Sequence, residues 1–171
     1  MNQKLLVFFV FLNCAFGLTA QQTATISSAE ISFTFVSKNV EGTISGFESS
    51  SAIHLDALED SKFKGSVAVE TIKTGNFLRD WSLKSGKYFD ADTHPQLTFE
   101  STDVTKTNDG YSVKGELTIK GTSKAITIDF KRNDNQLIGT TTLFSSDFGI
   151  EIKNDREDNE VYVKFVLSLK T

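Results

Sequence analysis

The stretch TGNFLRDWSLKSGKYFDADTHPQLTFES, from Thr74 to Ser101, departs from the strand-like alternation found in the rest of the chain. Thr74 is a typical N-cap residue, and Gly86 is a typical residue at which a helix ends. The pattern therefore predicts one short helix over residues 76–85, followed by a loop. Everything around this stretch is typical of β-sheet.

The predicted helix has one apolar face and one charged face. Phe77, Leu78 and Trp81 gather on one side, which is the pattern of a buried helical stripe. We expect Trp81 to close or line the adjoining sheet structure rather than face water. Arg79 and Asp80 lie on the other face, where they can anchor the helix through charged hydrogen bonds or contact the head group of a ligand. Both roles stay open.

Other segments alternate apolar and polar residues with a period of two, which predicts half-buried strands. The clearest case begins at Ile31, where Ile31, Phe33 and Phe35 share one face. Turn signals such as 108–110 (Asn-Asp-Gly) separate the segments and favour antiparallel neighbours. The further predicted strands are 41–47, 51–56, 65–72, 96–104, 111–119, 124–132, 136–145 and 161–169.

These strands predict an all-β, antiparallel β-barrel of about eight or nine strands with one short helix. A barrel is favoured because closure removes exposed sheet edges. An open sandwich is the alternative. Residues 21–171 form one domain of ordinary size, and no repeat or linker divides them.

The N-terminus is typical of a secretory signal peptide over residues 1–20. Lys4 precedes an apolar run at 5–12, and Leu18-Thr19-Ala20 provides a small-residue cleavage site. The run is shorter than the roughly 20 residues of a spanning helix, so we expect no stable membrane span. We expect cleavage near Ala20 and a periplasmic or secreted protein.

The single cysteine, Cys14, lies inside this predicted signal peptide. Leu12 and Asn13 before it fit a lipoprotein attachment site poorly, which favours plain secretion over lipidation. The mature chain then has no cysteine for a disulfide, for thiol catalysis or for a metal. The full chain has a formal net charge of −4 and no clustered basic face, so a nucleic-acid partner is disfavoured.

Catalytic and metal-binding patterns are not recognisable. His54 and His94 lie far apart without the spacing of a metal site or a catalytic triad. His94 precedes Pro95 and is typical of a turn. The acidic run at 153–160 lacks the spacing and central glycine of a calcium loop, and we expect it to form a hairpin tip. We therefore expect no enzyme activity, no metal and no cofactor.

Phenylalanine is abundant, with fifteen residues against three tyrosines and one tryptophan. Small barrels either fill their interior with side chains or keep a cavity for one ligand. The sequence pattern does not separate these two cases.

Separated blocks of the chain resemble, in the right order, the YceI-like family of secreted lipid-binding β-barrels. Within 74–101 these are T-G-N, R-D-x-x-L-K-S, Y-F-D, H-P and T-F-x-S. GELTIKGTSK at 115–124 and SDFGI at 146–150 follow. The resemblance covers essentially the whole mature chain. It implies a lipocalin-like barrel that holds a long isoprenoid or similar amphiphilic lipid in an apolar tunnel.

The resemblance, combined with the alternation of side chains along each predicted strand, implies a set of tunnel-wall residues. These are Phe33, Phe35, Ile53, Trp81, Phe89, Phe99, Leu117, Ile128 and Phe165. Each buried CH₂ of a lipid contributes about 0.8 kcal/mol, so such a tunnel needs no catalytic group and no polar anchor. Ala68 and Gly115 are small residues in predicted strands, where we expect a bulky replacement to block the tunnel.

The implied function is non-catalytic binding of an isoprenoid-like or other long-chain amphiphile, for transport, storage or sequestration. The alternative is a structural or interaction module with a filled barrel core and a protein partner. A homodimer is a further candidate assembly. The chain departs from the family pattern at Trp81 and Ser82, where members commonly carry an acidic residue and a histidine. Ser82 can hydrogen-bond a head group but cannot carry a positive charge.

Overall fold

The computed structural model describes residues 23–171, so the predicted signal peptide at 1–20 lies outside the described residues. Within them, the strands are β1 (Thr23–Phe35), β2 (Val40–Ile44), β3 (Glu48–Ser49), β4 (Ile53–His54), β5 (Lys64–Ala68), β6 (Gln96–Lys106), β7 (Tyr111–Ile119), β8 (Thr122–Asn133), β9 (Gln136–Phe144) and β10 (Glu160–Lys170). The α-helix is α1 (Phe77–Lys84), and short 3-10 turns are η1 (Val36–Lys38), η2 (Leu58–Asp60), η3 (Val69–Thr71), η4 (Ser145–Phe148) and η5 (Glu157–Asn159).

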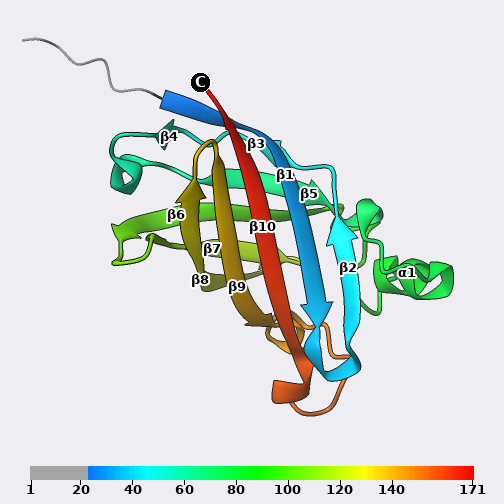
Figure 1. Ribbon diagram of the computed structural model, residues 1–171. Helices are drawn as coiled ribbons and strands as arrows, with labels where there is room; N and C mark the ends of the chain where they lie inside the picture. Colours follow the sequence, from blue (N-terminus) through cyan, green and yellow to red (C-terminus); the bar gives the residue numbers. More distant parts are fainter. Residues whose placement is uncertain (1–22) are drawn as a thin grey trace, which may run out of the picture.

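A single antiparallel sheet runs in the order β2-β1-β10-β9-β8-β7-β6-β5-β3, and β4 pairs with β1. Figure 1 shows how this sheet curls so that β1 and β10 lie across from β5, β6 and β7. The two sides are joined where Thr43 of β2 and Lys73 exchange backbone hydrogen bonds of 2.8 and 3.0 Å. The predicted all-β antiparallel barrel class is confirmed.

Six of the nine predicted strands lie within two residues of the observed ones. β1 begins at Thr23, eight residues before the predicted start at Ile31, and β2 ends at Ile44, three residues before the end of the segment 41–47. The segment 65–72 also differs. Its strand ends at Ala68, and the chain turns through η3. The hydroxyl of Thr71 explains the turn, because it donates to Ala68 O at 2.7 Å and accepts the N–H of Ser45 at 2.8 Å. Side-chain bonds of this kind compete with continued strand pairing. The turn thereby links β5 to the end of β2.

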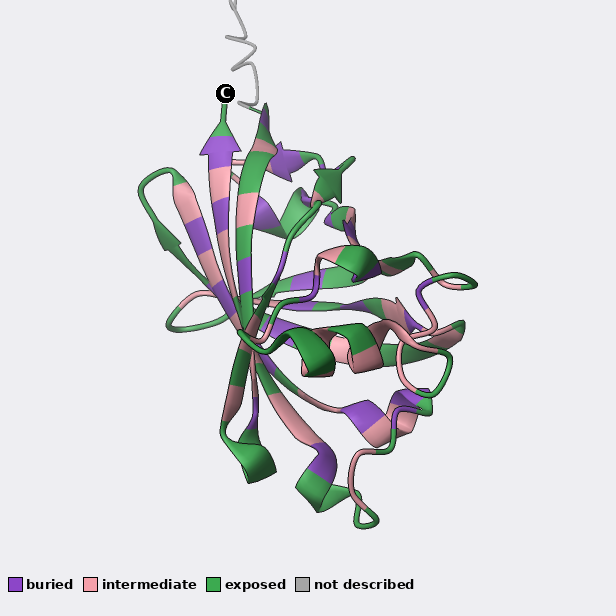
Figure 2. Cartoon of the chain, turned by 90° about the vertical axis from the view of Figure 1, so that its right-hand side faces the viewer, coloured by how far each residue is buried: buried purple, intermediate pink, exposed green. Residues whose placement is uncertain are grey.

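The apolar core gathers in three places along the barrel, and Figure 2 shows the buried residues alternating with exposed ones along the strands. One cluster closes the end near β4 and η2, around Ile53, Leu58 and Phe63. A second lies between β1, β2 and η3. A third, around Phe148 and Ile150, lies at the opposite end near η4. The middle of the barrel is left for the cavity described below.

The polar segment between β9 and β10 is an ordered loop organised around Asn159. This side chain is completely buried, and its Oδ1 accepts the N–H groups of Ile152 and Lys153 at 2.9 and 3.0 Å. Its Nδ2 donates to the carbonyls of Lys153 and Asp155, both at 2.8 Å. One amide therefore satisfies four backbone groups that lack strand partners.

An Arg156–Asp147 pair fixes the outer side of the same loop. The guanidinium donates two hydrogen bonds of 2.7 Å to the carboxylate and stacks 3.7 Å above the ring centroid of Phe144. The hydrogen bonds from Arg156 lower the pKa of Asp147 below its ordinary value. No group of three or more His, Cys, Asp and Glu side chains in the described chain is arranged to hold a metal. Among its helices, none combines the length and apolar character needed to cross a bilayer.

Candidate functional site

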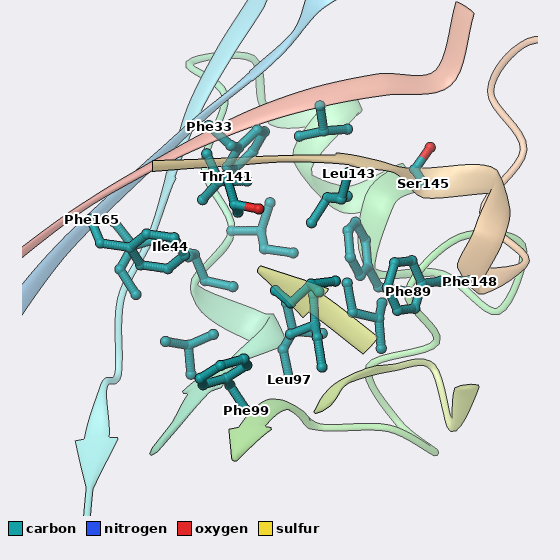
Figure 3. A pocket seen from close by; sticks show the side chains of 18 of the residues that line it. Phe33, Ile44, Phe89, Leu97, Phe99, Thr141, Leu143, Ser145, Phe148 and Phe165 are labelled. Carbon is teal, nitrogen blue, oxygen red and sulfur yellow. The ribbon is translucent and has the colours of Figure 1, made fainter. Parts of the chain in front are cut away.

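A cavity of about 680 Å³ occupies the middle of the barrel. Its wall comes from both sides of the curled sheet and from α1. Figure 3 shows phenylalanine rings, leucines and isoleucines facing it, among them Phe33, Leu97 and Phe165. The volume falls in the range of about 300 to 1,000 Å³ typical of small-molecule sites. The phenylalanines of the barrel therefore line a space rather than fill it completely.

Seven of the nine predicted tunnel-wall residues line this cavity. They are Phe33, Phe35, Phe89, Phe99, Leu117, Ile128 and Phe165. Six of them lie on strands, where alternate residues face the same side of the sheet, whereas Phe89 lies in the loop after α1. Their contact with a ligand stays a prediction. The same alternation also identifies wall residues that the prediction omitted, such as Ile31 on β1 and Leu143 on β9.

Ile53 does not line the cavity. It is fully buried in the apolar cluster that closes the β4 end, together with Ala24 and Leu58. The strand that contains it has only two residues and pairs with the first residues of β1, beyond the cavity. The wall assignment was therefore wrong, since the segment caps the barrel end instead of crossing its middle.

Trp81 is also misassigned, because 69% of it is exposed. Phe77 and Leu78 are 80% and 73% exposed, so the expected buried stripe faces solvent. The face of α1 that lines the cavity consists of Arg79, Ser82 and Leu83. These three lie at i, i+3 and i+4, which is also a helical stripe. The short helix thus offers two candidate faces, and the more polar one is turned inward.

The start of α1 also differs from the prediction. Asn76, not Thr74, is the N-cap, since its Oδ1 accepts the N–H of Arg79 at 3.0 Å. Thr74 instead joins the two charged residues of the helix. Its N–H and hydroxyl donate to Asp80 Oδ1 at 2.8 and 2.5 Å. Its hydroxyl and carbonyl oxygens accept from Arg79 Nε and Nη2 at 2.6 and 2.7 Å.

This network gives Arg79 and Asp80 the anchoring geometry that the sequence suggested. The hydrogen bond from the Thr74 hydroxyl is the main reason why the pKa of Asp80 lies below its ordinary value. Arg79 also lines the cavity, so it lies within reach of a ligand while two of its nitrogens are bonded to Thr74. Its head-group role stays a prediction.

Glycines set beneath aromatic rings keep the cavity open. A Cβ added to Gly115 would come 2.6 Å from Phe99 Cε2 and 2.5 Å from the carbonyl oxygen of Glu100. The Phe99 ring therefore packs directly onto the backbone of β7, against the wall. Gly115 itself does not line the cavity, and neither does Ala68, whose Cβ would be 3.0 Å from a side chain at Gly46. A bulky replacement at either position would overpack the wall rather than block the lumen.

Buried hydroxyl groups of the wall donate to backbone carbonyl groups. Thr141 donates to the carbonyl of Thr127 at 2.7 Å, and Ser145 donates to the carbonyl of Ile150 at 2.8 Å. Such groups add little polarity to the space they border. Most of the wall is hydrocarbon, and it suits a chain of carbon atoms.

The charged residues of the cavity wall are Lys38, Lys64 and Arg79, all of them cations. Lys64 is paired with Glu100 at 2.7 Å, and both side chains are more than half exposed. Sequence reasoning missed Lys38 and Lys64, because lysines in a turn and on an edge-proximal strand are usually solvated and carry no distinguishing pattern. The site thus combines an apolar interior with positive charge on its border.

The chain is similar in sequence to known proteins. The sequence profile of the YceI-like domain matches residues 19–169. A UPF0312 protein of Serratia proteamaculans is 35% identical over 92 residues, which cover 53% of this chain and 47% of that protein. A UPF0312 protein of Pectobacterium atrosepticum is 30% identical over 90 residues, with the same coverage. The matched part of the chain spans about half the length of these curated relatives.

Solved structures share the architecture. BcnA of Burkholderia cenocepacia superposes with a TM-score of 0.70 at 21% identity, covering 84% of this chain and 96% of that one. A polyisoprenoid-binding domain from Saccharophagus degradans, implicated in plant cell wall breakdown, superposes with a TM-score of 0.59 at 12% identity. That match covers 87% of this chain and 97% of the other. At these identities the likeness shows a common fold.

Proposed function

We propose that this chain, which belongs to the YceI-like domain family, binds one long-chain, isoprenoid-like amphiphile in the barrel cavity without chemical conversion. The polyisoprenoid-binding description of one structural neighbour supports this class of ligand. The observation that carries the proposal is the cavity itself, which is apolar and left open by rings packed onto glycines.

The size of the cavity suits a lipid chain. A water-sized group occupies about 30 Å³, so 680 Å³ accepts on the order of twenty carbon-sized groups. Each CH₂ removed from water contributes about 0.8 kcal/mol, although immobilising the chain offsets part of this gain. A chain of this length can therefore be retained without a covalent bond.

The border of the cavity favours an amphiphile whose polar end is anionic or neutral. Lys38, Lys64 and Arg79 would repel a cationic head group, and no acidic side chain belongs to the described wall. Ser82 adds a hydroxyl at the same border. Arg79 and Ser82 both belong to α1, so a head group that meets them lies near α1 with its chain in the barrel.

We further propose that the protein works outside the cytoplasm, as the signal-peptide pattern at 1–20 suggests, and that it carries, stores or sequesters its lipid there. In an aqueous compartment a long isoprenoid needs a carrier, because its apolar surface is poorly soluble.

The direct test is organic extraction of the purified chain followed by mass spectrometry. The proposal predicts close to one lipid per chain, with an apolar tail long enough to occupy the cavity. Two results together would support the interaction-module alternative. The chain would carry no lipid after gentle purification, and the delipidated chain would take up no polyprenyl phosphate offered in detergent.

A further inference from the structure

Two stacked phenylalanine rings close the cavity at its β4 end. Phe63 and Phe130 both line the cavity, and they are only 5% and 3% exposed. Their ring centroids lie 5.4 Å apart, with an angle of 13° between the ring planes. We propose that this ring pair, Phe63 and Phe130, sets the greatest length of lipid chain that the barrel accepts. The inference rests on the proposed function, because only a barrel that binds a lipid chain has a chain length to select.

The ring pair spans the interior of the barrel. Phe63 directly precedes β5, Phe130 lies on β8, and two further strands lie between β5 and β8 in the sheet. Neighbouring strands lie about 4.8 Å apart, so the two backbones are roughly 14 Å apart along the sheet. Rings that nonetheless stack must meet across the inside of the curled sheet. They therefore block the path of a chain that runs along the barrel.

Behind the ring pair the barrel is packed solid. Of the buried residues in the cluster at this end, Phe63, Ile128, Phe130 and Leu167 line the cavity. The buried members of the cluster that do not line it are Ala24, Ile53, Leu58, Val104, Val113, Leu137 and Leu169. The ring pair thus separates an open cavity from a dry apolar layer.

The opposite end of the cavity is built differently. The three buried residues of the cluster there, Ile119, Phe148 and Ile150, all line the cavity themselves. A second buried layer behind the lining residues is therefore a feature of the β4 end. A smaller side chain in the ring pair would lengthen a cavity that stays enclosed by apolar residues.

Contacts to three other strands hold both rings in place. The N–H of Phe63 donates to Ser101 Oγ at 2.9 Å, and its carbonyl accepts the N–H of Ser101 at 2.8 Å. Gly139 is the strand partner of both Phe130 and Phe165, and a Cβ there would come 2.7 Å from Phe130 Cδ1. The rings of Phe130 and Phe165 also lie 6.4 Å apart between centroids. A longer chain would have to break these contacts to pass.

The border at α1 fixes the other end of the chain. Arg79, Ser82 and Leu83 line the cavity, and Leu83 packs against the second apolar cluster rather than the one behind the ring pair. A head group held at α1 leaves only the distance to the ring pair for the tail. Each CH₂ that fits raises the affinity about fourfold before the cost of immobilising the chain is subtracted. Carbons beyond the limit stay in water and add nothing.

The experiment offers the delipidated protein an equal mixture of polyprenyl phosphates that differ by one isoprene unit. The series is centred on about twenty carbons, the number that the cavity volume accepts. Native mass spectrometry then gives the relative occupancy of each chain length. In the wild type, occupancy should rise with chain length up to a limit and then level off or fall.

Phe63→Ala should move this limit upward by about one isoprene unit. A large-to-small change in an apolar core leaves a dry space on the order of 150 Å³, which accepts roughly six carbons. The occupancy of the first over-long chain, relative to the limiting chain, should rise at least about tenfold. Phe63→Leu should raise the same ratio less, and it keeps a buried apolar side chain in case Phe63→Ala fails to fold.

Leu137→Ala is the matched control. Leu137 is completely buried behind the ring pair and does not line the cavity. Its truncation should lower the melting temperature and leave the chain-length limit where it is, because the rings still close the cavity. The comparison separates a specific stop from general loosening of the barrel end.

Three results would overturn the proposal: a wild type whose occupancy keeps rising across the series, an unchanged ratio in folded Phe63→Leu and Phe63→Ala, or an equal shift in Leu137→Ala. Absence of binding at every chain length would contradict the proposed function instead. Binding of these lipids without a limit would leave the proposed function intact and contradict the role of the ring pair alone.

Discussion

The ring of Phe33 lies over Gly42, its antiparallel partner in β2. A Cβ at Gly42 would come 2.8 Å from Phe33 Cε1 and 2.8 Å from the carbonyl oxygen of Lys73. The glycine therefore lets an aromatic side chain lie flat on the neighbouring strand where the sheet nearly closes. An aromatic ring over a strand glycine is a known way to cover exposed backbone. In this barrel the same packing holds the Phe33 ring against the wall and leaves space in the middle of the barrel.

Replacement of Gly42 by alanine should push the Phe33 ring into the cavity. We expect a loss of roughly 1 to 3 kcal/mol in the free energy of unfolding, as for other overpacked sites, together with weaker lipid retention. Urea unfolding measures the first effect, and lipid content per chain measures the second. Gly86→Ala is the control, because a Cβ there is 3.7 Å from its nearest neighbour. Equal stability of the two variants would refute this packing relationship.

The Asp80 carboxylate should contribute stability that depends on pH. Hydrogen bonds from Thr74 hold its folded pKa below the ordinary value, so its contribution is present above the unfolded pKa of about 3.9. The contribution is lost as the pH falls through the lower folded pKa. Urea unfolding should therefore find Asp80→Asn less stable than the wild type at pH 7, with a difference that shrinks below about pH 4.

The exposed Asp129→Asn is the matched control, since it removes the same charge on β8 rather than beside α1. It should be close to the wild type in stability at pH 7. A gap between Asp80→Asn and the wild type that stays constant from pH 7 to pH 3 would show that the carboxylate does not stabilise the helix through its charge.

Arg79 should act mainly as an anchor of α1. Loss of its two hydrogen bonds to Thr74 in Arg79→Ala should cost about 1 to 2 kcal/mol in unfolding free energy. Arg79→Lys should recover little of this, because an ammonium lacks the planar fork that reaches both Thr74 oxygens. Lipid content should change less than stability does. Unaltered stability with complete loss of lipid would assign Arg79 to the head group instead.

Asn159 should be the most sensitive residue of the loop between β9 and β10. Asn159→Ala removes four hydrogen bonds that its amide makes to the backbone of the loop, and we expect a loss of about 2 to 4 kcal/mol in unfolding free energy. Asp155→Ala, at an exposed neighbour in the loop, should change stability by less than about 0.5 kcal/mol. Similar melting temperatures for the two variants would contradict the role given to the Asn159 amide.

Much of the sheet could be predicted because the side chains of a strand alternate between the face that meets the core and the face that meets solvent. The segment 111–119 matches β7 at both ends, and this alternation also placed Phe33, Phe99 and Phe165 on the cavity side. The two-residue strand β3 was missed, since so short a segment carries no period. Where alternation is long and one face is buried, sequence and structure agree.

The helix shows what pattern alone cannot decide. Apolar residues on one face of α1 normally indicate burial, yet Trp81 faces solvent and Arg79 faces the cavity. The inward face is chosen by Thr74, which bonds to both Arg79 and Asp80 and fixes how the helix is rotated. Such a contact between a loop hydroxyl and two helix charges leaves no periodic signal. The sequence also does not reveal whether the aromatic side chains fill the barrel or leave it open. That depends on Gly42 and Gly115, which lie beneath the rings of Phe33 and Phe99.

The central claim is that the cavity holds a lipid chain, and a pair of neighbouring substitutions on β9 tests it most directly. Leu143 faces the cavity, as Figure 3 shows, whereas Thr142 is exposed on the outer side of the same strand. The measurement is the number of lipid molecules per chain by native mass spectrometry for the wild type, Leu143→Trp and Thr142→Trp. We predict about one lipid in the wild type and in Thr142→Trp, and a large loss in Leu143→Trp at a retained fold. Equal lipid content in the two variants, or no lipid in the wild type, would contradict the account.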